Sequence, residues 1–345
     1  MAARVQQLVL GLSTGKQTDI ATAKSTGFLR FKKLNSDLTS PGFGTENDAA
    51  EFGKGNEFIS AAGVFPTAWS HGNRLEKYAS AEWVAWVMAF ALGSVSETPH
   101  NASAPAPAYS TYVITPIDPA TTLILPYFTL IEQVPEGGST AIDNMFVGCA
   151  LEDFAFDFNY GPGRASAKLT ANWVGSGKLT QPSGIVVPAT LAENYMLSQS
   201  ATVSIVTVDY VANGTILAGS IGWKNNLLLG AGFYPGSGLQ SGAAIRGRME
   251  IGARVPTLQF TARLLSSSAE YTKLIAQTTG TVTITFTYDA YDSVSFVFQS
   301  VSFEAVENVD VDGIVAVRVT CAPKWHATNG LLTVTAKSQV QGIAA

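Results

Sequence analysis

The sequence predicts a β-dominated α+β protein. The chain has 345 residues, of which 32 are glycine, and its β-branched and aromatic residues recur in short runs. Phe154, Phe156 and Phe158 alternate with polar residues, which is the period of a half-buried strand. One stretch, KYASAEWVAWVMAFALG, is long and apolar enough for a strong helix. Many short strands with one or two helices are therefore expected.

Strand candidates follow one another along most of the chain. In order, they lie at residues 28–34, 112–116, 126–134, 154–160, 165–173, 201–211, 215–223, 226–233, 245–265 (broken by Pro256), 281–288, 293–303, 314–321 and 331–337. The clearest is a ribbon over Leu151–Val174 that turns at Gly161–Gly163. Its phenylalanines would share one face, while Asp153 and Asp157 take the other.

Two helices are predicted. The first covers Lys77–Gly93, with Ser80 as its N-cap and Gly93 as its stop. From Trp83 to Leu92 it is apolar on every face, so we expect it to be buried on every face. Burial against a neighbouring subunit would account for this. The second, shorter helix covers Ser267–Gln277.

The chain divides into two halves, residues 1–191 and 192–345, which share an order of parts. Each half has entry strands, a helix, two strands and a final hairpin-like pair, so that Leu151–Val174 would correspond to Ile314–Lys337. Residue identity between the halves is low, and β-hairpins also look alike by themselves. Both an internal duplication and two unrelated halves stay open.

A long polar segment, Asn35–Asn73, has the length of a functional or disordered loop.

Composition excludes several classes of protein. The formal net charge is −5 and the longest basic run is Arg30–Lys33, which argues against a nucleic-acid reader. Only 14% of residues are charged, compared with roughly 25% in soluble domains, so burial between subunits is expected. No stretch approaches the length of a membrane helix. A short apolar N-terminus without a signal-peptide core predicts a cytosolic product, in which Cys149 and Cys321 are expected to be free thiols.

No constellation of catalytic residues is apparent. The three histidines lack a second ligand at metal spacing, and the glycine-rich segments miss the spacing of phosphate or dinucleotide loops. Asp153 and Asp157 on one strand would lie roughly 13 Å apart, too far for a glycosidase pair. We therefore expect a non-enzymatic protein with no catalytic residues, no cofactor and no metal site.

The layout resembles the tail tube proteins, the major tail proteins of long-tailed bacteriophages. The resemblance covers most of the chain and is carried by diffuse patterns. These are Gly15–Thr18, the helix Ser80–Gly93, the ribbon Leu151–Gly175, the segment Arg246–Gly252 before a long strand, and the closing strand LLTVTAKSQV. The resemblance implies a β-sandwich or barrel-like fold flanked by a helix, present here either once or as two tandem units.

This resemblance implies a structural role in the virion. Such subunits close into rings, of six chains or of three chains with pseudo-six-fold symmetry, and the rings stack into a hollow tube through which DNA passes without specific binding. The protein would assemble in the bacterial host cytoplasm, with other tail proteins as further partners and no membrane. Trp83, Trp86 and Phe90 are the candidates for a subunit interface, and Asp153 and Asp157 for polar residues facing the lumen. The rival interpretation is a β-sandwich module that binds a receptor or carbohydrate, such as a tail-tip protein or an adhesin.

Overall fold

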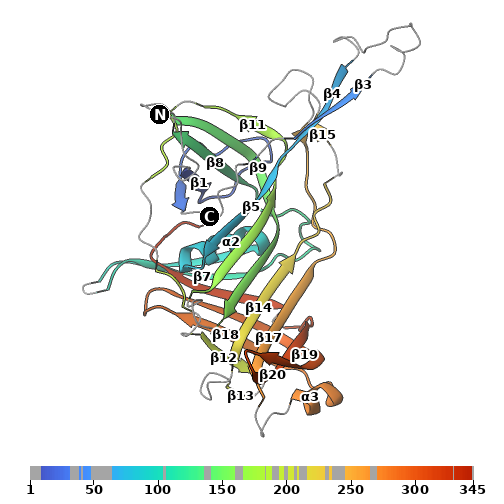
Figure 1. Cartoon of the computed structure of the whole chain (residues 1–345). Helices are drawn as coiled ribbons and strands as arrows, with labels where there is room; N and C mark the ends of the chain where they lie inside the picture. Colours follow the sequence, from blue (N-terminus) through green and yellow to red (C-terminus); the bar gives the residue numbers. More distant parts are fainter. Residues whose placement is uncertain are drawn as a thin grey trace.

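The computed structural model consists of one extended antiparallel sheet that folds back on itself around a buried helix (Figure 1). Within the described part of the chain, seventeen strands are hydrogen-bonded into this sheet, which is not closed there, and two small hairpins lie outside it. The β-dominated α+β class is therefore confirmed. The structure describes residues 9–31, 39, 42–47, 64–103, 106–135, 141–159, 166–182, 184–188, 194–197, 201–205, 208–209, 216–229, 233–234, 245–264, 270–328 and 330–343.

The sheet is easiest to follow as three parts, here called sheets 1, 2 and 3. Sheet 1 runs β5 (Gly72–Tyr78), β10 (Lys168–Val174), β9 (Ala141–Asn159), β14 (Ile216–Lys224), β17 (Val255–Arg263), β20 (Ile314–Pro323) and β19 (Ser293–Val311). Sheet 2 runs β13 (Val208–Asp209), β12 (Ala201–Ile205), β18 (Gly280–Thr287), β19, β21 (Leu332–Ser338), β7 (Tyr109–Pro116) and β6 (Gly93–His100).

Sheet 3 runs β2 (Phe28–Phe31), β1 (Val9–Ser13), β8 (Phe128–Pro135), β9 and β11 (Lys178–Thr180). The two separate hairpins are β3 (Gly42–Asn47) with β4 (Val64–Ser70), and β15 (Phe233–Tyr234) with β16 (Ile245–Arg246). The β3–β4 hairpin extends away from the rest of the molecule (Figure 1).

Two long strands join these parts, because each belongs to two sheets at once. The first half of β9 pairs in sheet 3 and its second half in sheet 1. The first half of β19 pairs in sheet 2 and its second half in sheet 1. In β9 the change occurs at Gly148, whose φ of 64° is in the left-handed region that favours glycine.

Sheets 1 and 2 face one another across a core of phenylalanines. The ring of Phe156 in β9 lies 5.1 Å from Phe286 in β18 and 5.0 Å from Phe296 in β19, measured between centroids. All three side chains are almost fully buried. The alternating pattern read from the sequence is thus confirmed, and it gives the fold its sandwich-like character.

Helix α2 (Ala81–Leu92) fills the space that the three sheets enclose. It ends at Gly93 in the left-handed conformation, as the sequence predicts, but it begins four residues later than predicted because β5 continues to Tyr78. Ser80 occupies the N-cap position without a side-chain cap bond. The second helix, α3 (Glu270–Ala276), lies on the surface at the opposite end of the molecule from the β3–β4 hairpin (Figure 1).

Three expectations about the chain's irregular parts need correction. Asn35–Asn73 is not one long loop, since it contains β3, β4 and the start of β5; the rest of it, apart from Thr39 and His71, lies outside the described residues. The strand predicted over residues 245–265 is two separate strands, and Pro256 lies inside the second rather than at the break. Among the described residues of Asn226–Phe233, only Leu228 in a bridge and Phe233 at the start of β15 are paired, and Asn226 has a positive φ.

Candidate functional site: a repeated sheet and its polar face

The pairing registers reveal an internal duplication that extends to single residues. Strand β19 has 19 residues, as does β9, and it begins 152 residues after it. In the β8–β9 pair, Phe128 lies opposite Cys149, and a bulge follows before the register resumes at Leu130. In the β18–β19 pair, Gly280 lies opposite Val301, and a bulge again follows before the register resumes at Val282. Each of these three residues lies 152 positions after its equivalent in the β8–β9 pair. Bulges are local features that families preserve, so a shared one marks equivalent strands.

The second halves of the two long strands repeat in the same way. The β9–β10 pair has a bulge at position 152, and the β19–β20 pair has one at position 304, which is again 152 residues later. The return strand then pairs with the strand that precedes the helix: β10 with β5, and β20 with β17. Two bulges and three pairings therefore agree between the halves.

The outer strands complete the correspondence. β8 pairs with β1, which pairs with β2, just as β18 pairs with β12, which pairs with β13. β11 pairs with the first half of β9, and β21 with the first half of β19. We call the first set repeat 1 (β1, β2, β5, α2, β8, β9, β10, β11) and the second set repeat 2 (β12, β13, β17, α3, β18, β19, β20, β21).

The repeats differ in ways that hide them in the sequence. Repeat 1 carries the β6–β7 hairpin between its helix and β8, whereas α3 is followed directly by β18. Few equivalent residues are identical; Phe146 with Phe298 and Glu152 with Glu304 are two. The expected match of Leu151–Val174 with Ile314–Lys337 is wrong, because Leu151 corresponds to Phe303.

The repeats share one sheet rather than forming separate units. β9 of repeat 1 pairs with β14, which pairs in turn with β17 of repeat 2. β21 of repeat 2 pairs with β7. The boundary at residue 191 therefore separates two topological repeats but not two independent hydrogen-bonded bodies.

Repeat 2 leaves open an edge that repeat 1 has covered. Residues 153–157 of β9 pair with β10 on one side, and residues 153–159 pair with β14 on the other. The equivalent residues 305–311 of β19 pair with β20 on one side, and no strand among the described residues pairs with them on the other. An open strand edge presents unpaired N–H and C=O groups to another chain.

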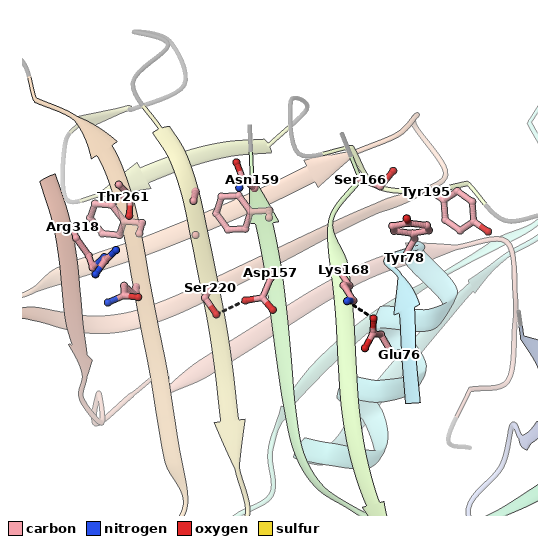
Figure 2. Close-up of a pocket in the computed structure, with 15 residues that line it drawn as sticks. Glu76, Tyr78, Asp157, Asn159, Ser166, Lys168, Tyr195, Ser220, Thr261 and Arg318 are labelled. Carbon is pink, nitrogen blue, oxygen red and sulfur yellow. Dashed lines mark hydrogen bonds and ion pairs between the residues drawn. The ribbon is translucent and has the colours of Figure 1, made fainter. Parts of the chain in front are cut away.

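The outward face of sheet 1 is polar and forms an open groove of about 1010 Å³ (Figure 2). Its charges are largely satisfied by neighbours on the same face. Glu76 forms ion pairs with Lys168 and Arg74, and Asp157 accepts a 2.6 Å hydrogen bond from Ser220. Cationic and anionic groups thus balance locally, so the face carries no strong field of either sign.

Asp153 and Asp157 both lie on this outward face, as their alternation with the phenylalanines predicts. Asp153 accepts a 2.7 Å hydrogen bond from the amide of Asn172 on β10, whereas Asp157 is exposed in the groove. The strand register separates the two carboxylates by four positions, and each has its own partner. The arrangement suits a solvated strand face rather than an acid–base pair.

The aromatic residues of α2 are buried within the chain itself, which corrects the expected role of Trp83, Trp86 and Phe90. All three are at most 1% exposed. Trp86 donates a 2.9 Å hydrogen bond to the carbonyl of Ser13, and its ring lies 4.9 Å from that of Phe128. They are therefore not available to a neighbouring subunit.

His71 is a buried titratable group whose pKa is strongly lowered. Its ring lies between Phe146 and Trp173, at centroid distances of 4.9 and 5.7 Å, and it is buried. Neither ring nitrogen has a hydrogen-bond partner among the described residues. Burial lowers the pKa of His71 to about 3, assisted by the charge of Arg246, so the ring is neutral at ordinary pH.

The two cysteines are free and buried, as expected. Burial raises the pKa of the Cys321 thiol to about 12 and that of the Cys149 thiol well above its usual value.

Among the described residues, no group of histidine, cysteine, aspartate or glutamate side chains could hold a metal ion. No helix in the described part of the chain is long and apolar enough to cross a membrane. No protein-family model and no curated protein sequence matches this chain.

Proposed function

We propose that this chain is a self-assembling structural protein whose repeats continue one sheet from copy to copy. The observation that carries the proposal is the matched pair of repeats together with their unequal edges. Within the chain, the edge of β9 in repeat 1 is covered by β14, which leads into repeat 2. The equivalent edge of β19 would be covered in the same way by the repeat 1 side of a second copy.

Repetition of this head-to-tail contact produces a closed ring if the rotation between repeats closes. Because each chain supplies two equivalent repeats, three chains would make a pseudo-six-fold ring. This is the arrangement that the resemblance to phage tail tube proteins implies, and we propose the same role here: rings that stack into a hollow virion tail tube, assembled in the bacterial host with other tail proteins.

The locally balanced charges of sheet 1 are compatible with a surface along which DNA moves. Proteins that hold DNA supply clusters of Lys and Arg to its phosphates. Here the groove pairs Lys168 with Glu76, and Arg318 lies opposite Glu307 in the strand register. We propose that this face, including Asp157 and the more covered Asp153, lines the lumen.

Native mass spectrometry and negative-stain microscopy of the purified protein test the assembly. We expect hollow rings or tubes, with a ring mass three times the 36.3 kDa of one chain. A stable six-chain ring would contradict the three-chain arrangement, and a monomer at all concentrations would contradict assembly. We also propose that the projecting β3–β4 hairpin forms the contact between rings, so deletion of residues 42–70 should leave rings but abolish tubes.

The groove also supports one alternative function, the binding of a carbohydrate. Its lining combines hydroxyl and carboxylate groups with Tyr78 and Tyr195, whose rings lie 5.8 Å apart (Figure 2). Polar groups beside aromatic rings are what a carbohydrate-binding module would use. Binding on a glycan array that Tyr78→Ala abolishes, from a protein that forms no rings, would favour this alternative.

A further inference from the structure

Helix α3 packs Leu274 against the core but leaves two of its larger apolar side chains, Tyr271 and Ile275, exposed. Its two charged residues point toward the chain: Glu270 is buried, and the half-buried Lys273 places its ammonium group 6.0 Å from the centre of the Phe303 ring. The residues exposed to solvent are uncharged, with Ile275 84% and Tyr271 42% exposed. A surface helix normally buries its apolar stripe and exposes its charged residues, whereas α3 packs only Leu274 of its larger apolar residues against the core.

The adjoining end of the β19–β20 hairpin extends this apolar surface. Tyr271 donates a 3.1 Å hydrogen bond to the side chain of Asn308 in β19, which fixes the helix against the hairpin. At the start of β20, Val315 is 61% exposed and lies on the same face of the hairpin as Asn308. We call Tyr271, Ile275 and Val315 the α3 surface. Clustered exposed apolar residues of this kind mark interaction sites.

The duplication indicates what covers the α3 surface. Helix α2, the equivalent helix of repeat 1, has no exposed residue: all twelve are buried. Part of its cover comes from the other repeat, because α2 contacts β21 and β19 of repeat 2. The equivalents of those strands in repeat 1 are β11 and β9. Within one chain, α3 has no third repeat to supply the same cover.

We propose that the α3 surface is a docking site for repeat 1 of a second copy of this chain. The contact between α2 and repeat 2 inside the chain is its template, and the open edge of β19 lies on the same repeat. The docking site rests on the proposed ring assembly and deepens it, since it assigns the contact to named residues. It also explains why α3 turns uncharged side chains toward water.

Substitution at Ile275 tests the energetic part of the proposal. Ile275→Glu should raise the protein concentration needed for ring formation by roughly tenfold or more, the effect of losing one buried apolar anchor. Ile275→Leu, the matched control, should assemble like the parent. Because Ile275 is exposed in the single chain, circular dichroism melting of the dilute Ile275→Glu protein should match that of the parent.

Photo-cross-linking tests the identity of the partner and does not depend on that variant. Ile275→Cys is labelled with a maleimide–benzophenone reagent, to which the buried Cys149 and Cys321 are unreactive. Isotope-labelled and unlabelled copies are mixed, irradiated and digested. We expect cross-links between copies, from position 275 to peptides within residues 1–191.

The possible results separate this inference from the proposed function. Rings that form normally with Ile275→Glu, or cross-links confined to one copy in a preparation that contains rings, would overturn the docking site and leave the ring assembly standing. Cross-links between copies that reach only repeat 2 would also overturn it. A parent protein that stays monomeric at all concentrations would overturn both.

Discussion

Replacement of Trp86 by alanine should be among the most destabilising substitutions in this protein. The side chain is 0% exposed and packs on Phe90 and Phe128, with ring centroids at 4.8 and 4.9 Å. Truncation of a buried tryptophan costs about 3–5 kcal/mol. Loss of its N–H also leaves the buried carbonyl of Ser13 without this 2.9 Å partner, which adds about 1–3 kcal/mol. We expect a total loss of about 4–8 kcal/mol.

Urea unfolding followed by circular dichroism measures this loss. Trp86→Phe keeps the aromatic contacts and removes the hydrogen bond, so it should cost about 1–3 kcal/mol. Trp325→Ala makes the same chemical change at a side chain that is 68% exposed, and it should stay within about 0.5 kcal/mol of the parent. Similar losses for Trp86→Ala and Trp325→Ala, or a loss below about 1 kcal/mol for Trp86→Ala, would refute the burial of α2 within the chain.

Three further predictions concern other buried sites. The pKa of His71 falls from 6.5 in the unfolded chain to about 3 in the fold, so below pH 6.5 the unfolded chain binds a proton that the folded chain does not. The free energy of unfolding should therefore decline by up to about 1.4 kcal/mol per pH unit between pH 6.5 and pH 3. Urea titrations at several pH values measure this decline, and His71→Leu should flatten it. Gly148→Ala should lower the melting temperature far more than Gly313→Ala: both have positive φ, but a Cβ at Gly148 would lie 2.2 Å from the carbonyl oxygen of Ile20, whereas one at Gly313 meets nothing within 4 Å. Cys149 and Cys321 should not react with a disulfide reagent at pH 8 until urea unfolds the chain; rapid labelling of the native protein would contradict their burial and raised thiol pKa values.

Local patterns were sufficient to predict the elements whose side chains alternate strictly. The phenylalanines of β9 follow a two-residue period, so their common face and the outward position of Asp157 could be predicted without the fold. The end of α2 was equally local, because Gly93 supplies the left-handed conformation that a helix stop requires. Strands such as β1 and β11 were missed, since they lack a clear alternation and are held in place by partners distant in sequence.

The residues of the candidate interface could not be predicted from the chain alone. An apolar helix signals burial, but the sequence does not state which surface buries it, and α2 proved to be covered by its own chain. The apolar face of α3 is short and gives only a weak pattern. Its exposure becomes apparent only when the neighbouring strands are in place, so the surface proposed for docking was absent from the sequence-based candidates.

The sequence by itself determined the β-dominated class, the clearest ribbon and the existence of an apolar helix, because each depends on the spacing of neighbouring residues. Only the tertiary structure decided that the two halves are equivalent. The equivalence is seen in the strand registers and bulges, which depend on hydrogen bonds between backbones. These are the same in both repeats although the side chains differ: Phe154 is equivalent to Val306, and Asp157 to Val309. Backbone pairing needs side chains only of suitable size and polarity on each face, so a duplication can persist in the sheet after its residues have diverged.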